Sequence, residues 1–263
     1  AVGVNALGAN TTGAANTALG VGALSSNTTA ASNTAVGVNA LADNTTGANN
    51  VAVGRSALES NTTANEHVAI GYGALTANTT ARSNTAVGYN SLQANTTGQI
   101  NTAVGQQSMY SNTTGVDNVA MGYAALYGNT TGGSNAAFGY GSLQSSSTQA
   151  GNTGVGYNAL NGCTTGLGRN VGVGQSSNGA VTTGAANTAI GWATGGVTTG
   201  NGNTVMGYIT TTGSTTAENR IVIGYNVAGV ADNTVTLGKQ ANTASLGLDG
   251  SDTSWAAASS DER

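Results

Sequence analysis

The sequence predicts an all-β chain folded as a parallel β-solenoid, or β-roll, in which each coil has about seventeen residues. Two observations carry this prediction. A phrase of the type Asn-Thr-Ala-Val-Gly returns at a constant seventeen-residue interval through most of the chain, up to about position 160. The chain also has no proline among 263 residues, which suits coils that donate backbone hydrogen bonds to one another. A short, strict period is typical of a solenoid, in which each coil buries its apolar side chains against its neighbours.

Composition excludes several other classes of protein. Only 6% of the residues are charged and 38% are hydrophobic, unlike disordered segments, which are usually rich in charge and proline. The net charge is −4 and lysine and arginine do not cluster, so we expect no nucleic-acid partner. No run approaches the roughly 20 apolar residues of a membrane span, so we expect no membrane insertion. Cys163 is the only cysteine, which excludes an intrachain disulfide.

The glycine that closes the phrase divides the chain into zones. Its spacing is constant from Gly3 to Gly156, and the following intervals to Gly247 are 18, 17, 16, 17, 14 and 9. The chain begins inside a repeat, so we expect it to be a piece of a longer protein. We expect a regular solenoid over residues 1–160, irregular repeats over 161–217, a cap of shortened repeats over 218–258, and the start of another domain at 259–263.

The three residues before each marker glycine alternate in character, which predicts a short strand. The residue directly before the glycine is large and apolar, and we expect it to point into the coil. This column comprises Leu19, Val36, Val53, Ile70, Val87, Val104, Met121, Phe138 and Val155.

The middle residue of each predicted strand is alanine in the regular body, at Ala18, Ala35, Ala52, Ala69, Ala86, Ala103, Ala120 and Ala137. Small side chains let two backbones approach closely, so we expect this column to pack against identical chains. Two large inward side chains per coil also make a lean core for one chain. We therefore expect a homotrimer around a three-fold axis, the alternative being that the alanines simply face solvent.

A second apolar column follows four residues after each glycine, and we expect it to supply the core contact of a second strand. Its members are Leu7, Leu24, Leu41, Leu58, Leu75, Leu92, Met109, Leu126, Leu143 and Leu160.

An Asn-Thr-Thr turn closes each coil in constant register. Stacked identical asparagines can hydrogen-bond along a ladder, and glycine can occupy the positive-φ corners of a tight coil. The predicted ladder includes Asn27, Asn44, Asn61, Asn78, Asn95 and Asn112.

Aromatic residues are not scattered along the chain. Most follow a marker glycine directly, where an exposed column could stack on sugar rings. The alternatives are that the rings stack on one another or cover the seam of a trimer. The column comprises Tyr72, Tyr89, Tyr123, Tyr140, Tyr157, Trp192, Tyr208 and Tyr225, while Tyr110 and Tyr127 share another position.

Other polar residues give no catalytic or metal site. The paired threonine columns that begin at Thr11 and Thr12 resemble the flat arrays of ice-binding solenoids, although hydroxyl bonds to nearby backbone explain them as turns. His67 stands where other coils carry asparagine, and we expect a surface substitution. The acids are too sparse for a paired-carboxylate glycosidase. We expect no cofactor, no metal and no catalytic residue in the body of the chain.

Two stretches resemble known families. The phrase N-[ST]-x-A-[VI]-G is similar to the β-roll repeat of trimeric autotransporter adhesin heads, although here the coil is longer. The segment 219–263 resembles the part of bacteriophage tail fibres that precedes an endosialidase-type intramolecular chaperone domain, whose opening is similar to Ser-Asp-Glu-Arg at 260–263. The resemblance implies a homotrimer, and it implies that Ser260 lies at the junction where that chaperone cuts itself off.

The sequence therefore predicts a structural and receptor-binding shaft of a phage tail fibre, located in the virion and not an enzyme apart from that self-cleavage. Its expected partners are two further copies of the chain and a glycan or protein of the host cell surface. The alternatives are the head of a trimeric adhesin on a bacterial cell surface and an ice-binding solenoid.

Overall fold

The computed structural model describes residues 1–164, 166–248 and 256–257, the last pair by backbone alone, and within these ranges it is all-β without a helix. The chain divides into two compact units, Ala1–Asn135 and Ala136–Arg263. In unit 1, and in unit 2 as far as the strand Thr234–Lys239, the strands pair in parallel, and equivalent residues of neighbouring coils, such as Asn95 and Asn112 or Asn170 and Asn187, are 17 positions apart. The predicted parallel β-solenoid is therefore confirmed.

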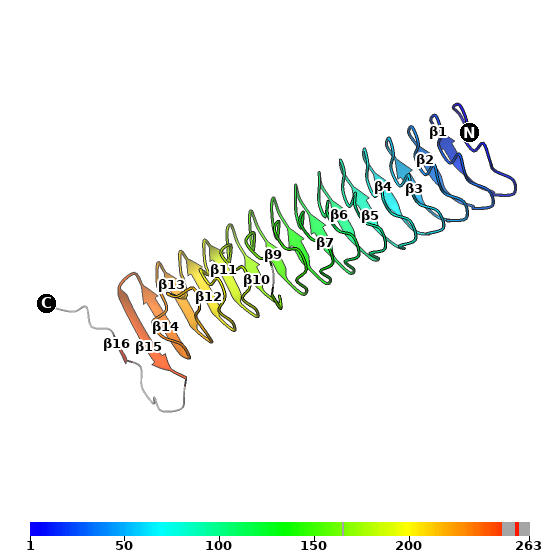
Figure 1. Ribbon diagram of the computed structural model, residues 1–263. Coiled ribbons are helices and arrows are strands. Elements are labelled where there is room, and N and C mark those ends of the chain that lie inside the picture. The colour runs from blue at the N-terminus through cyan, green and yellow to red at the C-terminus, as the bar shows by residue number, and fades with distance from the viewer. Residues whose placement is uncertain (165, 249–255, 258–263) are drawn as a thin grey trace. The chain divides into compact units, whose positions relative to one another are not determined.

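Unit 1 is a regular stack of coils that each carry one three-residue strand (Figure 1). Neighbouring strands pair in parallel with equivalent residues side by side, for example Thr85 with Thr102. The strands are β1 (Thr17–Leu19), β2 (Thr34–Val36), β3 (Val51–Val53), β4 (Val68–Ile70), β5 (Thr85–Val87), β6 (Thr102–Val104) and β7 (Val119–Met121).

Unit 2 continues the same type of coil and ends differently. The strands from β8 to β14 pair in parallel, whereas β15 runs antiparallel to β14 and pairs Gly247 with Thr234. Gly247 therefore lies in a hairpin and does not close a further coil. The strands are β8 (Ala136–Phe138), β9 (Thr153–Val155), β10 (Val171–Val173), β11 (Thr188–Trp192), β12 (Thr204–Tyr208), β13 (Ile221–Tyr225), β14 (Thr234–Lys239), β15 (Asn242–Gly247) and β16 (Ala256–Ala257).

The strands alternate as predicted, but their two faces are the reverse of what we expected. The alanine column points into the coil, where Ala35 and Ala86 are fully buried. The large apolar column points outward, and Leu19 and Ile70 are 49% and 39% exposed. The reason is the width of the coil, because leucine from the opposite wall fills the interior and leaves room for only a methyl group. The expectation that alanine packs against another chain is therefore wrong.

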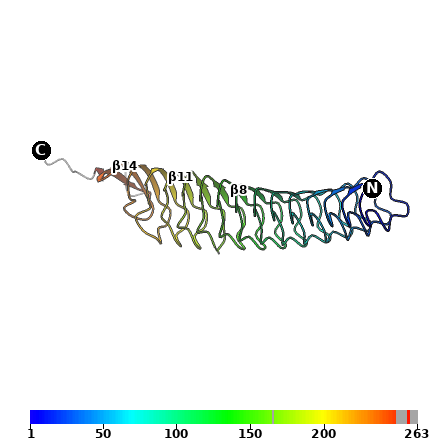
Figure 2. The ribbon, with the colours of Figure 1, turned by 90° about the horizontal axis from the view of Figure 1, so that it is seen from above.

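The leucine column is buried as expected, but it does not belong to a second strand. Leu92 is fully buried, yet it lies in a turn with φ of 51°, two residues after Asn90 with φ of 50°. Two left-handed residues so close together bend the backbone sharply and turn the leucine inward. Figure 2 shows strands along one side of the coils and turns on the other.

The marker glycines from Gly3 to Gly224 occupy positive-φ corners, as predicted. Gly88 has φ of 138°, and a Cβ built on it would lie 2.5 Å from the carbonyl oxygen of Gly105 in the next coil. Glycine is needed here for its backbone conformation and for the close stacking of coils.

The core of unit 2 changes where the leucine column stops at Leu160. Asn178 takes the next position in that column, and the strand position that carries alanine elsewhere becomes valine two strands later, in β12 and β13. Val205, Val222 and Val227 then form a small buried cluster. In β12 and β13 the larger strand residues fill space that leucine fills in the regular coils, whereas β10 and β11 keep the small Gly172 and Ala189.

Candidate functional site

The predicted asparagine ladder is present in unit 1. Asn95 Nδ2 donates to Asn78 Oδ1 at 3.1 Å, and Asn112 Nδ2 donates to Asn95 Oδ1 at 2.9 Å. Each of these amides also donates to a backbone carbonyl of its own turn, such as Gly98 O at 2.9 Å from Asn95. The members are fully buried, so the ladder is an internal scaffold and offers nothing to a ligand.

A second buried asparagine column precedes most strands from β2 to β12, and the sequence analysis missed it. Asn101 donates through Nδ2 to Gly115 O at 2.8 Å, the same carbonyl that Asn112 binds from the first ladder. Its Oδ1 accepts the backbone N–H of Asn118 at 3.1 Å. The sequence feature that marks this second column is the asparagine that opens the repeated Asn-Thr-Ala-Val-Gly phrase.

His67 belongs to this second column and is fully buried, so the expected surface position is wrong. Its Nδ1 accepts the Asn84 backbone N–H at 3.1 Å, which leaves Nε2 to donate to Ala81 O at 2.6 Å. The imidazole replaces an asparagine amide because it too offers one acceptor and one donor. Burial lowers the pKa of His67 below its ordinary 6.5.

This lowered pKa predicts a pH-dependent stability. The unfolded chain takes up a proton as the pH falls through about 6.5, whereas the folded chain resists it until its lower pKa. The free energy of unfolding should thus be largest above pH 6.5 and decline below it. Urea unfolding at several pH values tests this prediction. The control is His67→Asn, which restores the asparagine found at this position of the second column in other coils. An equal decline in that variant would contradict the assignment.

In unit 2 other residues occupy the positions of the asparagine ladder. Its positions are taken by Ser146, Cys163, Val181 and Val197. The thiol of Cys163 is buried against the side-chain oxygen of Gln149, and burial raises its pKa to about 11. Such a thiol is protonated and unreactive near neutral pH.

Arg220 ends the second column in unit 2, another feature that the sequence analysis missed. Its backbone N–H donates to Asn203 Oδ1 at 3.0 Å, as an asparagine would there. Its guanidinium forms a salt bridge with Asp232 at 2.8 Å and donates to Thr212 O at 2.6 Å. A hydrogen bond from the Glu218 N–H, followed by that from Arg220, lowers the pKa of Asp232.

The outward strand face of each unit carries a column of large apolar side chains. In unit 1 it comprises the large column that includes Leu19, Ile70 and Met121, flanked by threonine or valine two residues earlier. In unit 2 the five-residue strands widen it, so that Ile190 and Trp192 share one face of β11. No outward position of this face from β1 to β13 is charged. Extended apolar surfaces of this kind mark interaction sites.

The aromatic rings stack on one another along the coils. Tyr72 and Tyr89 have ring centroids 5.4 Å apart, and Tyr208 stacks on both Trp192 and Tyr225 at 4.9 and 5.1 Å. The rings are also exposed, at 47% for Tyr72 and 49% for Tyr89. The stacking interpretation is confirmed for these residues, and sugar binding stays a prediction.

The threonine turns agree with the backbone-bonding interpretation. Thr45 Oγ1 donates to Thr62 O at 3.0 Å in the next coil, and the bond repeats along unit 1. No group of three or more histidine, cysteine or acidic residues could hold a metal within the described part of the chain. No helix in that part is long and apolar enough to cross a membrane. Ser260 lies outside the described residues.

Comparison with known proteins gives no further guide, because no family model, no curated protein and no solved structure matches the chain.

Proposed function

We propose that the chain is a structural and receptor-binding shaft of a phage tail fibre, assembled as a homotrimer in the virion. The observation that carries this proposal is the uncharged apolar face along the strands of each unit. A single chain leaves this face in water, whereas three copies around one axis bury it in identical interfaces. The face replaces the alanine column as the surface through which the chains associate.

The shaft works by stiffness and repetition. Each coil donates backbone hydrogen bonds to both neighbours, as Leu92 does to Ser108 O in the next coil and Asn90 to Tyr72 O in the preceding one. Three identical lateral surfaces then act together, because linked weak contacts raise the effective concentration of each site. The partner is a glycan or protein of the host cell surface.

Replacing one outward residue by lysine should dissociate the trimer without unfolding the chain. Ile70→Lys places three charges in a buried apolar interface, and we expect association to weaken at least about a hundredfold. Thr63→Lys, in the exposed turn of the same coil, is the matched control. Sedimentation velocity measures both variants, and a trimer of unchanged affinity in Ile70→Lys would exclude this face as the interface.

The coding sequence that follows Arg263 tests the assignment to a tail fibre. We expect it to continue with Leu-Lys and an intramolecular chaperone domain that cuts itself off before Ser260. A coiled-coil stalk and a membrane anchor would instead make the chain the head of a bacterial surface adhesin. Thermal hysteresis of the purified protein would support the ice-binding alternative.

A further inference from the structure

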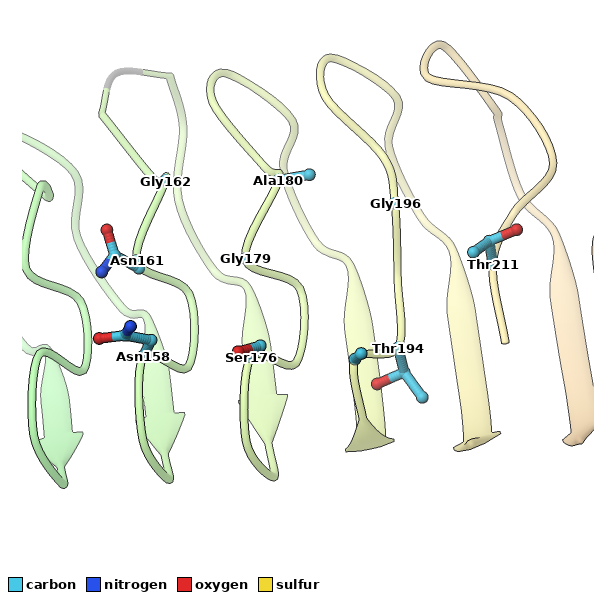
Figure 3. Close-up of a pocket in the computed structure, with 10 residues that line it drawn as sticks. Asn158, Asn161, Gly162, Ser176, Gly179, Ala180, Thr194, Gly196 and Thr211 are labelled. Carbon is cyan, nitrogen blue, oxygen red and sulfur yellow. The ribbon is translucent and has the colours of Figure 1, made fainter. Parts of the chain in front are cut away.

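Unit 2 carries an open groove of about 470 Å³ on the turns that follow β9, β10 and β11. Figure 3 shows Asn158 and Asn161 on one coil, Ser176 and Gly179 on the next, and Thr194 beyond them. A second hollow of about 380 Å³ shares Gly196 and Thr211 with the first. The two form one groove that is elongated along the direction in which the coils stack.

The groove exists because side chains present in other coils are absent here. Gly179 lies five residues after a marker glycine. Small residues hold this position in the first three coils, at Gly8, Ser25 and Ala42, and longer side chains hold it in the coils that follow, at Glu59, Thr76, Gln93, Tyr110, Tyr127, Gln144 and Asn161. A Cβ on Gly179 would lie 3.4 Å from its nearest neighbour, the carbonyl oxygen of Ser176, which is ordinary contact. Packing therefore does not require glycine at this position.

Gly162, also in the groove, is different. A Cβ there would lie 2.4 Å from the carbonyl oxygen of Gly179, so the close stacking of the coils requires this glycine. Three glycines thus line the groove. Gly162 is required by coil stacking and Gly196 has a φ of 89°, whereas Gly179 meets neither requirement and leaves open space.

The polar groups of the groove are amides and hydroxyls. Asn158 and Asn161 supply amides, while Ser176, Thr194 and Thr211 supply hydroxyls, and none of the lining residues is charged. Asn158 Oδ1 is buried and has no hydrogen-bond partner among the described residues, so it is not open to a ligand. Asn161 Nδ2 donates to Gln144 Oε1 at 3.3 Å and Thr194 Oγ1 donates to Gly191 O at 3.3 Å, so these two residues offer a ligand chiefly their acceptor oxygens. Between these groups lie glycine backbone and the methyl groups of alanine and threonine. Neutral donors and acceptors alternating with small apolar patches match the hydroxyl and C–H surface of a sugar chain.

We propose that this groove binds a neutral, linear oligosaccharide segment of the host surface, an inference that rests on the proposed receptor-binding function. An anionic chain would lose hydration without meeting a positive charge in the groove. The elongated shape favours several consecutive sugar units over a compact ligand.

Isothermal titration with three neutral tetrasaccharides, maltotetraose, cellotetraose and fully acetylated chitotetraose, tests the proposal on the full chain. We expect at least one to bind with millimolar affinity or better. Gly179→Gln fills the groove with a side chain that Gln93 and Gln144 already present in equivalent coils, and we expect it to weaken binding at least about tenfold. Thr76→Gln, at the same coil position in unit 1, should bind as the parent does.

Thermal melts first establish that both variants are folded. Absence of binding by all three sugars, or equal binding by Gly179→Gln, would overturn the proposed site, as would binding of an extended peptide at the groove in their place. Failure of the tail-fibre proposal has a separate readout, because it is judged by the trimer and by the coding sequence after Arg263. A trimeric fibre chain whose groove is inert would therefore lose only this inference.

Discussion

Gly71→Ala should destabilise the protein by about 3–5 kcal/mol, among the largest effects of any single methyl group in the chain. Gly71 has φ of 134°, a conformation that side chains rarely adopt. Its added Cβ would lie 2.3 Å from the carbonyl oxygen and 2.6 Å from the carbonyl carbon of Gly88. Both atoms are backbone and are held by coil stacking, so the clash cannot be relieved by a side-chain rotation.

Gly73→Ala is the matched control, two residues away in the same coil. Gly73 has φ of 62°, close to the 50° that Asn90 adopts at the equivalent position of the next coil. The added Cβ meets only side-chain atoms, the nearest being the amide oxygen of Asn90, which can move. We expect a loss of about 1 kcal/mol or less. Urea unfolding of the two variants measures the contrast, and similar losses would show that the marker glycine has no special role.

Asn95→Asp should cost about 3–5 kcal/mol near neutral pH. The amide of Asn95 donates to Asn78 Oδ1 and Gly98 O, and a carboxylate has no proton for either. The substitution therefore places a buried negative charge beside two acceptor oxygens. Protonation of the new carboxyl supplies a donor, so the penalty should shrink as the pH falls toward about 4.

Asn95→Val separates lost hydrogen bonds from buried charge. Valine already occupies equivalent positions in unit 2, and Gly98 O keeps its bond from Asn84 Nδ2 at 2.8 Å. The substitution removes two bonds of the ladder: Asn78 Oδ1 loses its donor, and Asn112 Nδ2 loses its acceptor but keeps its bond to Gly115 O. We therefore expect a pH-independent loss of about 1–3 kcal/mol in the free energy of unfolding. A larger cost for valine than for aspartate at neutral pH would contradict the ladder's electrostatic account.

Much of this fold could be predicted from the period of the sequence, because identical coils must stack in register. The asparagine ladder, the buried leucines and the positive-φ glycines all followed from columns that repeat once per coil. Alternation along the strand separated two faces but could not say which one lies inside. That choice depends on the width of the coil, which is set by leucine on the opposite wall and is not a local property of Ala86 or Val87.

The remaining errors have similar causes. His67 looked like a surface residue because histidine is usually polar and exposed, whereas its two ring nitrogens reproduce the bonds of a buried amide. Arg220 ends the second asparagine column and contacts Thr212 and Asp232 across the coil. These contacts occur once and could not be predicted from a repeating pattern. The groove at Gly179 was invisible because a missing side chain creates it.

Sedimentation equilibrium of the purified chain tests the central claim most directly. The account predicts a species of three times the mass of one chain, with Ile70 and the rest of the outward face buried between copies. A stable, folded monomer at micromolar concentration would contradict the trimeric shaft and leave the apolar face without its proposed partner.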